Sequence, residues 1–513
     1  MIPTFFGLEL ALRALETQQS ALNTSGHNIA NANAVGYSRQ LTDMKATLPY
    51  VISYNGKDIS LGSGVTVASI ERARDVFVDR QYRLEFTKGE YWVSRADLIS
   101  KVETVFNESS EYSISGDLDR FWAAYNDLAT NPENTGARSV VQGRAIALTD
   151  TFHYVAQQLD DMQRNINDNI LNQVDQINLY AEQIKELNMQ IKNAQIVGDF
   201  PNDLLDRRDN LVDELSKIAN ITVIEQRDPR FTDRMVNTYT LVIGSETAVP
   251  KQVLVQDQEA THLKAGVDAN GFAMIQWAIA GTDLDLGAQK GLLLANIEVR
   301  DNYIPAIRAE LDKIAQGVAN AINALHQTGQ GMVVETDGIS LFTDGVTADT
   351  PGVLPSGITA ANITLNQLIQ DNPLRIATGA INAAGVVKSG DATVASAIAS
   401  LRDGWAALTD MMGAGVFGAA GQKPLDAVSI SDFYNAFIAG IGVNVQTADR
   451  MAVAQEMLVY QLAVQREAVS GVNLDEEMTN LVKYQKSYTA AARLVTMFDD
   501  MLETIVKGMG ITR

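Results

Sequence analysis

The sequence has 513 residues, 46% of them hydrophobic and 20% charged, a composition that suits a folded protein of about three domains. Its formal net charge of −22 argues against nucleic acid and against an anionic membrane as main partners. The absence of cysteine excludes disulfides, thiol catalysis and cysteine–zinc sites.

The negative charge belongs to the middle of the chain. Residues 1–40 have no net charge and residues 466–513 have a net charge of −1. Near-neutral ends can associate without much self-repulsion, whereas the acidic middle favours contact with water. We expect no secretory signal peptide, because the start MIPTFFGLELALR lacks a basic segment, and no membrane span, because no window offers about 18 uninterrupted apolar residues.

The first predicted element is one helix over about residues 4–32. Its apolar residues recur every seven positions, as in the seam of a coiled coil. These residues are Leu8, Leu15, Leu22 and Ile29. A single amphipathic helix is marginal in water, so we expect this stripe to pack against another helix.

A polar cluster follows in the stretch GHNIANANAVGYSRQ. Asparagine and glycine are poor helix formers, so the cluster predicts a helix end with asparagine and glycine caps. Its members are Asn28, Asn31, Asn33, Gly36, Tyr37, Ser38, Arg39 and Gln40. The neighbouring His27 fits a capping or surface role better than a metal or proton-transfer role.

Helical patterns fill most of the next 180 residues. We expect helix over 91–130 and 139–195, the second with isoleucines seven residues apart, and a helix after 201 with Asn202 or Asp203 as its cap. Short β-rich segments follow at 238–244, 252–256 and 272–279.

The remaining middle part mixes helix and loops. Helix is expected over 296–325, where a partly charged His326 would be favoured at the helix end, and loops with edge strands over 329–395. Helices resume near residue 394 and at 429–469.

The C-terminal helix mirrors the first one. Its heptad residues are Leu474, Leu481, Tyr488, Val495 and Leu502. Three acids at 475–477 fit the first turn, and Gly508 and Gly510 are expected to end the helix. Periodicity does not decide between a helix pair within one chain and a seam between subunits.

These elements predict an α+β fold that is mainly α, with three nested domains. Residues 1–40 with 466–513 form a terminal coiled-coil helix pair. Residues 41–220 with 290–328 and 394–465 form a helical bundle. Residues 221–289 with 329–393 form an inserted β-rich outer domain.

No motif for catalysis is visible. The four histidines lack a second metal ligand at helical spacing, and neither GxxxxGK[ST] nor GxSxG occurs. We therefore expect no catalytic residues, no metal and no cofactor.

At both ends the sequence resembles bacterial flagellar axial proteins, which include rod, hook and hook-associated proteins. The N-terminal match is Gly7–Gln40, where Ala34 replaces a frequent threonine, and the C-terminal match is Ser470–Val506. Within this superfamily, Ser38-Arg39-Gln40 and the interior segments DLDRFWAAYNDLATNPENTGAR and NDLLDRRDNLVDELS resemble the hook-associated protein 1 family.

This resemblance implies a structural subunit at the junction between hook and filament. It implies export of the unfolded chain by the flagellar type III system, an extracellular location and self-assembly into a ring through the terminal helices. The implied partners are hook protein, the second junction protein (hook-associated protein 3) and an export chaperone at the C-terminal helix.

Two alternatives stay open. One is another axial protein, such as a hook or distal-rod protein, which Ser38-Arg39-Gln40 disfavours. The other is a secreted adhesin or enzyme whose activity lies in residues 221–390.

Overall fold

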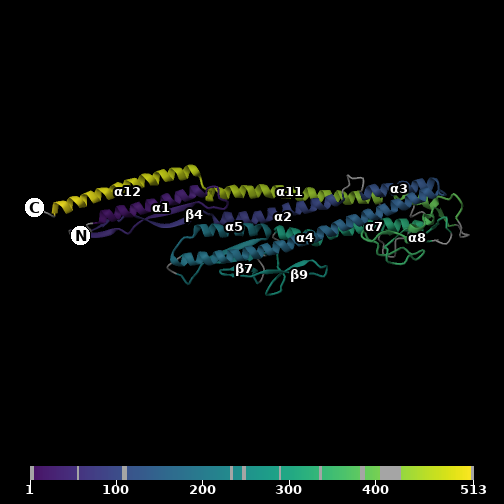
Figure 1. Ribbon diagram of the computed structural model, residues 1–513, viewed down its shortest axis with the longest axis horizontal. Helices are drawn as coiled ribbons and strands as arrows, with labels where there is room; N and C mark the ends of the chain where they lie inside the picture. Colours follow the sequence, from purple (N-terminus) through teal and green to yellow (C-terminus); the bar gives the residue numbers. More distant parts are fainter. Residues whose placement is uncertain are drawn as a thin grey trace.

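The computed structural model is an elongated molecule with both chain ends at the same end (Figure 1). It describes residues 5–54, 57–106, 113–231, 235–244, 250–287, 290–333, 338–381, 387–404 and 429–509. The predicted outer limits at 1 and 513, and the stretch 405–428 of the predicted helical bundle, lie outside these residues. Within the described ranges, no helix is long and apolar enough to cross a membrane.

Long helices form the frame, and the predicted mainly helical α+β class is confirmed. The helices are α1 (Phe6–Asn31), α2 (Val76–Phe106), α3 (Ile114–Thr130), α4 (Thr135–Val197), α5 (Asn202–Ile218), α6 (Leu292–Glu298), α7 (Ile304–His326), α8 (Gln367–Asp371), α9 (Thr393–Ser400), α11 (Ile430–Ser470) and α12 (Leu474–Met509). A π-helix, η1 (Val299–Tyr303), joins α6 to α7, and a short 3₁₀ helix, η2 (Pro373–Arg375), follows α8. α1 packs along α12 and α2 along α11, so opposite ends of the sequence lie side by side (Figure 1).

The sequence explains the length of α4. Asn134 caps its start by accepting hydrogen bonds from the backbone N–H groups of Gly136 and Ala137. Gly198 ends it in a left-handed conformation, with φ of 87°. The predicted isoleucine heptad is buried along the helix, at Ile170, Ile177, Ile184 and Ile191.

The main core lies where α3 and α4 meet α7 and the segments that follow it. Its largest buried side chains include Phe121, Trp122, Tyr125, Phe152 and Phe342. The rings of Phe121 and Tyr125 pack edge to face, with centroids 5.0 Å apart. This continuous core joins the helical part to the segments after 329.

Short antiparallel strands supply the β part. They are β1 (Gln40–Ala46), β2 (Tyr50–Tyr54), β3 (Lys57–Leu61), β4 (Val65–Arg72), β5 (Ile221–Arg227), β6 (Asn237–Ile243), β7 (Val253–Gln256), β8 (Glu259–Ala260), β9 (Leu263–Val267), β10 (Ala273–Trp277), β11 (Gly329–Gln330), β12 (Phe342–Thr343), β13 (Thr364–Leu365) and β14 (Gly379–Ala380). β5 to β8 form one four-stranded sheet, and β9 pairs with β10. The strands expected near 238–244, 252–256 and 272–279 are confirmed.

Strands β1 to β4 occupy a region that the sequence analysis placed with the helical bundle. β1 pairs with β4, with Gln40 opposite Arg72, and both strands contact α1. These strands leave apolar side chains exposed, for example Leu41 at 48%. Because they build little core, their hydrophobic pattern is weak in the sequence.

The predicted cap of α5 is wrong. Pro201 precedes the helix, and no side chain caps its start. Asn202 is the first helical residue, and its side-chain amide donates to the carbonyl of Ile70 at 2.7 Å. Asp203, in the first turn, accepts from the side-chain amide of Gln40 at 2.9 Å. Both side chains that were expected to cap the helix form hydrogen bonds to distant segments instead.

The expected partial charge on His326 is also wrong. Its ring is buried, Nδ1 lies 2.8 Å from the carbonyl oxygen of Ile339, and Nε2 lies 2.9 Å from the backbone nitrogen of Ala377. The first contact needs a proton on Nδ1 and the second needs none on Nε2, so the ring is neutral. Burial lowers the pKa of His326 to about 4, although the hydrogen bond to Ile339 opposes the shift.

We expect His326 to make the protein sensitive to mild acid. Between the ordinary pKa of 6.5 and the folded pKa of about 4, the unfolded chain binds a proton that the folded chain does not. The free energy of unfolding should therefore decrease as the pH is lowered through this window, by up to about 3 kcal/mol. Denaturant unfolding at several pH values measures this slope. A His326→Gln variant should lose that part of the slope, and an unchanged slope would contradict the assignment.

Candidate assembly interface

Asn28 folds the segment after α1 back onto the helix. Its side-chain oxygen accepts from the backbone N–H of Gln40 at 2.9 Å and from the hydroxyl of Tyr37 at 2.7 Å. Its side-chain nitrogen donates to the carbonyl of Gln40 at 2.9 Å. An amide can donate and accept at once, which explains an asparagine at this buried position. We call residues 27–40, with the α5 and α12 side chains that bind them, the N-terminal joint.

The other asparagines and Gly36 have different roles in the joint. Asn31, the last residue of α1, donates from its side chain to the carbonyl of His27 one turn back at 3.0 Å, whereas Asn33 is exposed. The predicted asparagine or glycine cap is wrong, because the residue after the helix is Ala32 in a right-handed conformation. Gly36 has a positive φ of 73°, and a Cβ atom there would lie 1.8 Å from the side-chain oxygen of Asn210. The positive φ therefore favours glycine, and any other residue would also have to displace the side chain of Asn210.

Ser38, Arg39 and Gln40 connect the joint to its neighbours. The backbone N–H and hydroxyl of Ser38 donate to Asp206 of α5 at 2.9 and 2.7 Å. The backbone N–H of Arg39 donates to the carbonyl of Ser470, the last residue of α11, at 2.8 Å. Its guanidinium binds Glu477 at 2.7 Å and Glu476 at 2.9 Å, both in the first turn of α12.

Next to the joint lies a largely buried cluster of alternating charges, which we call the ionic cluster. Asp209 is within 2.7 Å of Arg72, 2.8 Å of Arg74 and 3.5 Å of Arg83. Arg466 of α11 binds Asp79 of α2 at 3.0 Å and Asp213 of α5 at 2.7 Å. The cluster thus connects the strands near the terminal helices to three helices of the bundle.

The arginines of the ionic cluster keep the carboxyl of Asp209 ionised. Burial alone would raise the pKa of Asp209, but Arg74, Arg72 and Arg83 outweigh it and hold that pKa well below its ordinary value. At the joint, burial, reinforced by Asp203 and Asp206, raises the pKa of Tyr37, so its hydroxyl stays protonated and donates to Asn28.

The two terminal helices pair in antiparallel fashion, and each covers the heptad of the other only in part. Ala491 of α12 is 5% exposed, and a Cβ atom on Gly7 would lie 2.3 Å from the ring of Phe498. The heptad residues with intermediate exposure are Leu8, Leu15, Leu22, Ile29, Leu481, Tyr488, Val495 and Leu502. Leu474 is 47% exposed. The fully buried residues of α1 are smaller or polar: Ala11, Thr17, Ala21, Thr24, Ser25 and Asn28.

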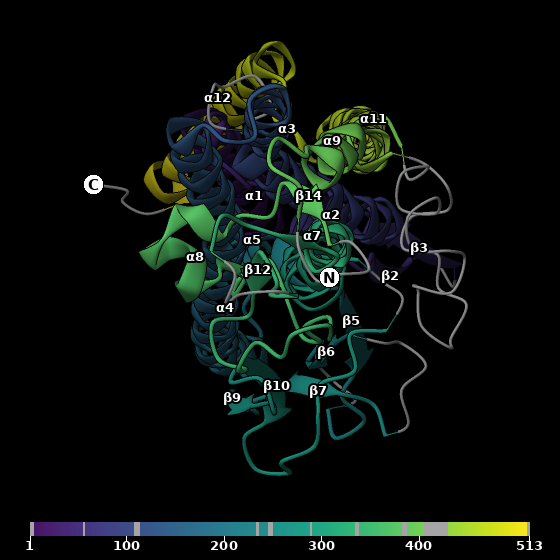
Figure 2. The same cartoon turned by 90° about the vertical axis from the view of Figure 1, so that its right-hand side faces the viewer.

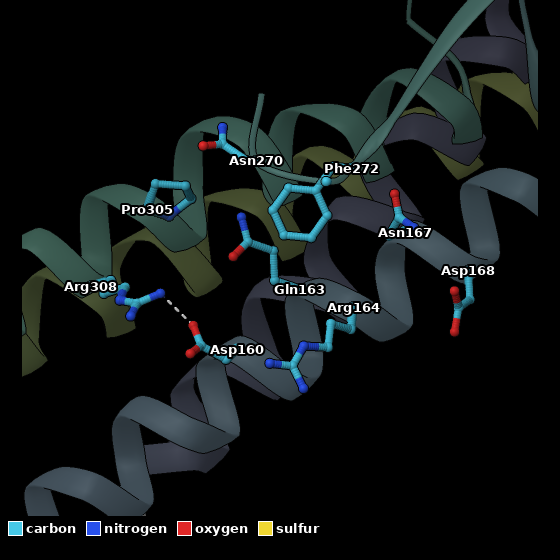
Figure 3. Close-up of a pocket in the computed structure, with 10 residues that line it drawn as sticks. Asp160, Gln163, Arg164, Asn167, Asp168, Asn270, Phe272, Pro305 and Arg308 are labelled. Carbon is cyan, nitrogen blue, oxygen red and sulfur yellow. Dashed lines mark hydrogen bonds and ion pairs between the residues drawn. The ribbon is translucent and has the colours of Figure 1, made fainter. Parts of the chain in front are cut away.

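A cleft of about 730 Å³ between α4, the β9–β10 hairpin and the start of α7 is the main rival site (Figure 3). Two of its charges are paired with each other, Arg308 and Asp160, and Gln163 donates to the carbonyl of Arg300 at 2.8 Å. Across the described ranges, no three His, Asp or Glu side chains are grouped to hold a metal ion.

Sequence reasoning missed the ionic cluster. Its signals were the acids of α5 at 203, 206, 209 and 213, which recur every three or four residues on one helix face, and the arginines at 72 and 74. Nothing in the pattern showed that the two segments meet.

Three comparisons place the chain among known proteins. The model of the "Flagellar hook-associated protein FlgK helical domain" matches residues 99–342, and two flagellar basal-body rod models match residues 8–37 and 465–507. "Flagellar hook-associated protein 1" of Bacillus subtilis is 30% identical and aligns over 100% of this chain and 99% of its own length. The protein of the same name from Salmonella typhimurium is 29% identical, over 96% and 98%.

A solved structure shows the same fold. It is "The structure of the flagellar hook junction protein FlgK from Burkholderia pseudomallei", with a TM-score of 0.58, 15% sequence identity, and coverage of 76% of this chain and 100% of that one.

Proposed function

The chain belongs to the flagellar hook-associated protein 1 family, and on that premise we propose that it forms the junction between the flagellar hook and the filament. The observation that carries the proposal is similarity along the whole chain at 30% identity, whereas the rod models match only the two ends. The relatives that match along the whole chain are named flagellar hook-associated proteins, which supports a structural subunit rather than an enzyme.

Assembly would proceed through the terminal helices. The stripes on α1 and α12 keep intermediate exposure in one chain, so a neighbouring copy could bury what each helix leaves uncovered. The joint would set the angle between these helices and the bundle, since Arg39 binds the end of α11 and the start of α12. The result would be a ring of copies with hook protein on one side and hook-associated protein 3 on the other.

Export would precede assembly. We expect the flagellar type III system to export the chain unfolded, which places the protein outside the cell. A cytosolic chaperone would cover α12, whose exposed apolar side chains include Met478 at 60%, Val482 at 51% and Met501 at 51%. Such a helix needs a partner before it meets other copies.

The junction role predicts that loss of the chain prevents filament attachment. A strain that lacks the chain should build hooks without attached filaments, and the full chain should restore filaments and motility. A chain without residues 475–513 should keep its bundle folded but restore neither. Electron microscopy with a label on the full chain should place it between hook and filament. Label elsewhere, or normal filaments without the chain, would contradict the proposal.

A further inference from the structure

The outward face of α11 carries an apolar stripe that no described part of the chain covers. It consists of Val453, Met457, Tyr460 and Val464, which lie on one helix face and are 51% to 72% exposed. The opposite face of α11 is buried against α2, through residues such as Ala448 and Leu462. We call the exposed residues the α11 stripe.

A groove of about 570 Å³ lies between α4 and α5. Its lining includes the apolar residues Leu187 and Leu211 and the charged residues Glu186 and Arg207. We call it the α4–α5 groove. Contacts run from α11 to α2, from α2 to α5, and from α5 to α4, so α11 and α4 lie on different sides of the molecule (Figure 2).

Both surfaces carry charges without a partner. Arg450 and Glu456 flank the α11 stripe, while Glu186 and Arg207 flank the groove. In the part of the chain that the structure describes, none of the four has an opposite charge within ion-pair distance; Arg450 contacts only the hydroxyl of Thr447, at 3.5 Å.

The order of these charges matches in one orientation. The end of α11 and the start of α5 both lie near the joint, because Arg466 binds Asp213 and Ser38 binds Asp206. Positions on both helices can therefore be ordered by their distance from the terminal helices. In that direction Glu456 precedes Arg450 on α11, and Arg207 precedes Glu186 at the groove.

The spacings also agree. Glu186 lies eleven residues before the end of α4, and Arg207 lies five residues after the start of α5. Along the bundle axis the two residues are therefore separated by about six residues of helix, or about 9 Å. Arg450 and Glu456 are six residues apart, again about 9 Å. Parallel copies would pair Arg450 with Glu186 and Glu456 with Arg207, whereas an antiparallel pair would bring like charges together.

We propose that the α11 stripe of one copy docks into the α4–α5 groove of a second, parallel copy. Two different surfaces then meet head to tail, which is the contact type that builds rings and helical tubes. Val453 would lie between the two ion pairs, opposite Leu187. This inference rests on the proposed junction function. It adds a contact between helical bundles to the proposed contact between terminal helices.

Disulfide cross-linking tests the contact, because the natural chain has no cysteine. Flagella that contain the double variant Val453→Cys with Leu187→Cys should yield covalent dimers and larger multimers after mild oxidation, while each single variant should stay monomeric. Dimers from Val453→Cys alone would show that two stripes meet and would overturn the proposal. So would monomers from the double variant in flagella that contain it.

Charge reversal gives a second, independent test. Arg450→Glu should lower incorporation into flagella by about tenfold, and adding Glu186→Arg should restore it. Equal incorporation by the single and double variants would overturn the contact. Absence of the unsubstituted chain from flagella would instead remove the junction function itself, so the two failures can be told apart.

Discussion

Asp209→Asn should destabilise the helical bundle by about 1.5–3 kcal/mol, because three guanidiniums lose one carboxylate partner while each keeps another, in Asp206, Asp79 or Asp213. The substitution keeps the shape of the side chain but removes the carboxylate that lies within 3.5 Å of Arg72, Arg74 and Arg83. These guanidiniums are largely screened from water, with side-chain exposures of 8% to 15%. Denaturant unfolding of the full chain, followed by far-UV circular dichroism, measures the loss.

Glu214→Gln on the same helix is the matched control. Its side chain is 48% exposed and pairs only with Lys217, so the loss should stay below about 1 kcal/mol. A similar small loss for Asp209→Asn would show that the ionic cluster does not hold the bundle and the strands together.

The depressed pKa of Asp209 adds a pH dependence of known sign. The unfolded carboxyl takes up a proton at a higher pH than the folded one, so the stabilisation is complete above the ordinary pKa of 3.8. It is lost as pH falls from there toward the folded pKa. The Asp209→Asn variant should therefore lose less stability than the natural chain below about pH 4.

How far the sequence predicts the fold depends on where each residue finds its partners. The isoleucines of α4 and the heptad of α12 repeat along one helix, and both helices could be assigned from sequence. Strands β1 to β4 leave apolar groups exposed, and the ionic cluster joins segments more than 100 residues apart, as between Arg72 and Asp209. Only the tertiary fold brings such groups together.

At the joint, too, the local structure could be predicted from the sequence but the contacts to distant segments could not. The sequence indicated the end of a helix here, and α1 does end at Asn31, but the residue after it is Ala32 and not the expected asparagine or glycine cap. It gave no sign that Ser38 binds Asp206 or that Arg39 connects α11 to α12. The family resemblance singled out Ser38-Arg39-Gln40 as a signature, and the structure supplies its physical reason, since each of these side chains contacts a distant segment.

Val495→Glu should abolish assembly while leaving the single chain folded. Val495 lies on the α12 heptad one turn before Phe498, which contacts the start of α1 near Gly7. In one chain its exposure is intermediate, so a new carboxylate there can reach water at modest cost. In an assembled seam the same carboxylate would be buried without a partner, at a cost of several kcal/mol, about enough to prevent incorporation. Motility and the amount of the variant in isolated flagella measure the effect.

Gln485→Glu is the matched control, because it adds one negative charge to an exposed polar position of α12 with almost no change in shape. It should assemble normally, whereas Leu481→Glu, on the same stripe as Val495, should fail. Unchanged circular dichroism of the soluble Val495→Glu chain would separate failed assembly from failed folding. If exported Val495→Glu protein reached the junction in normal amounts, the terminal heptad could not be the seam, and the α11 stripe would have to hold the copies together without it.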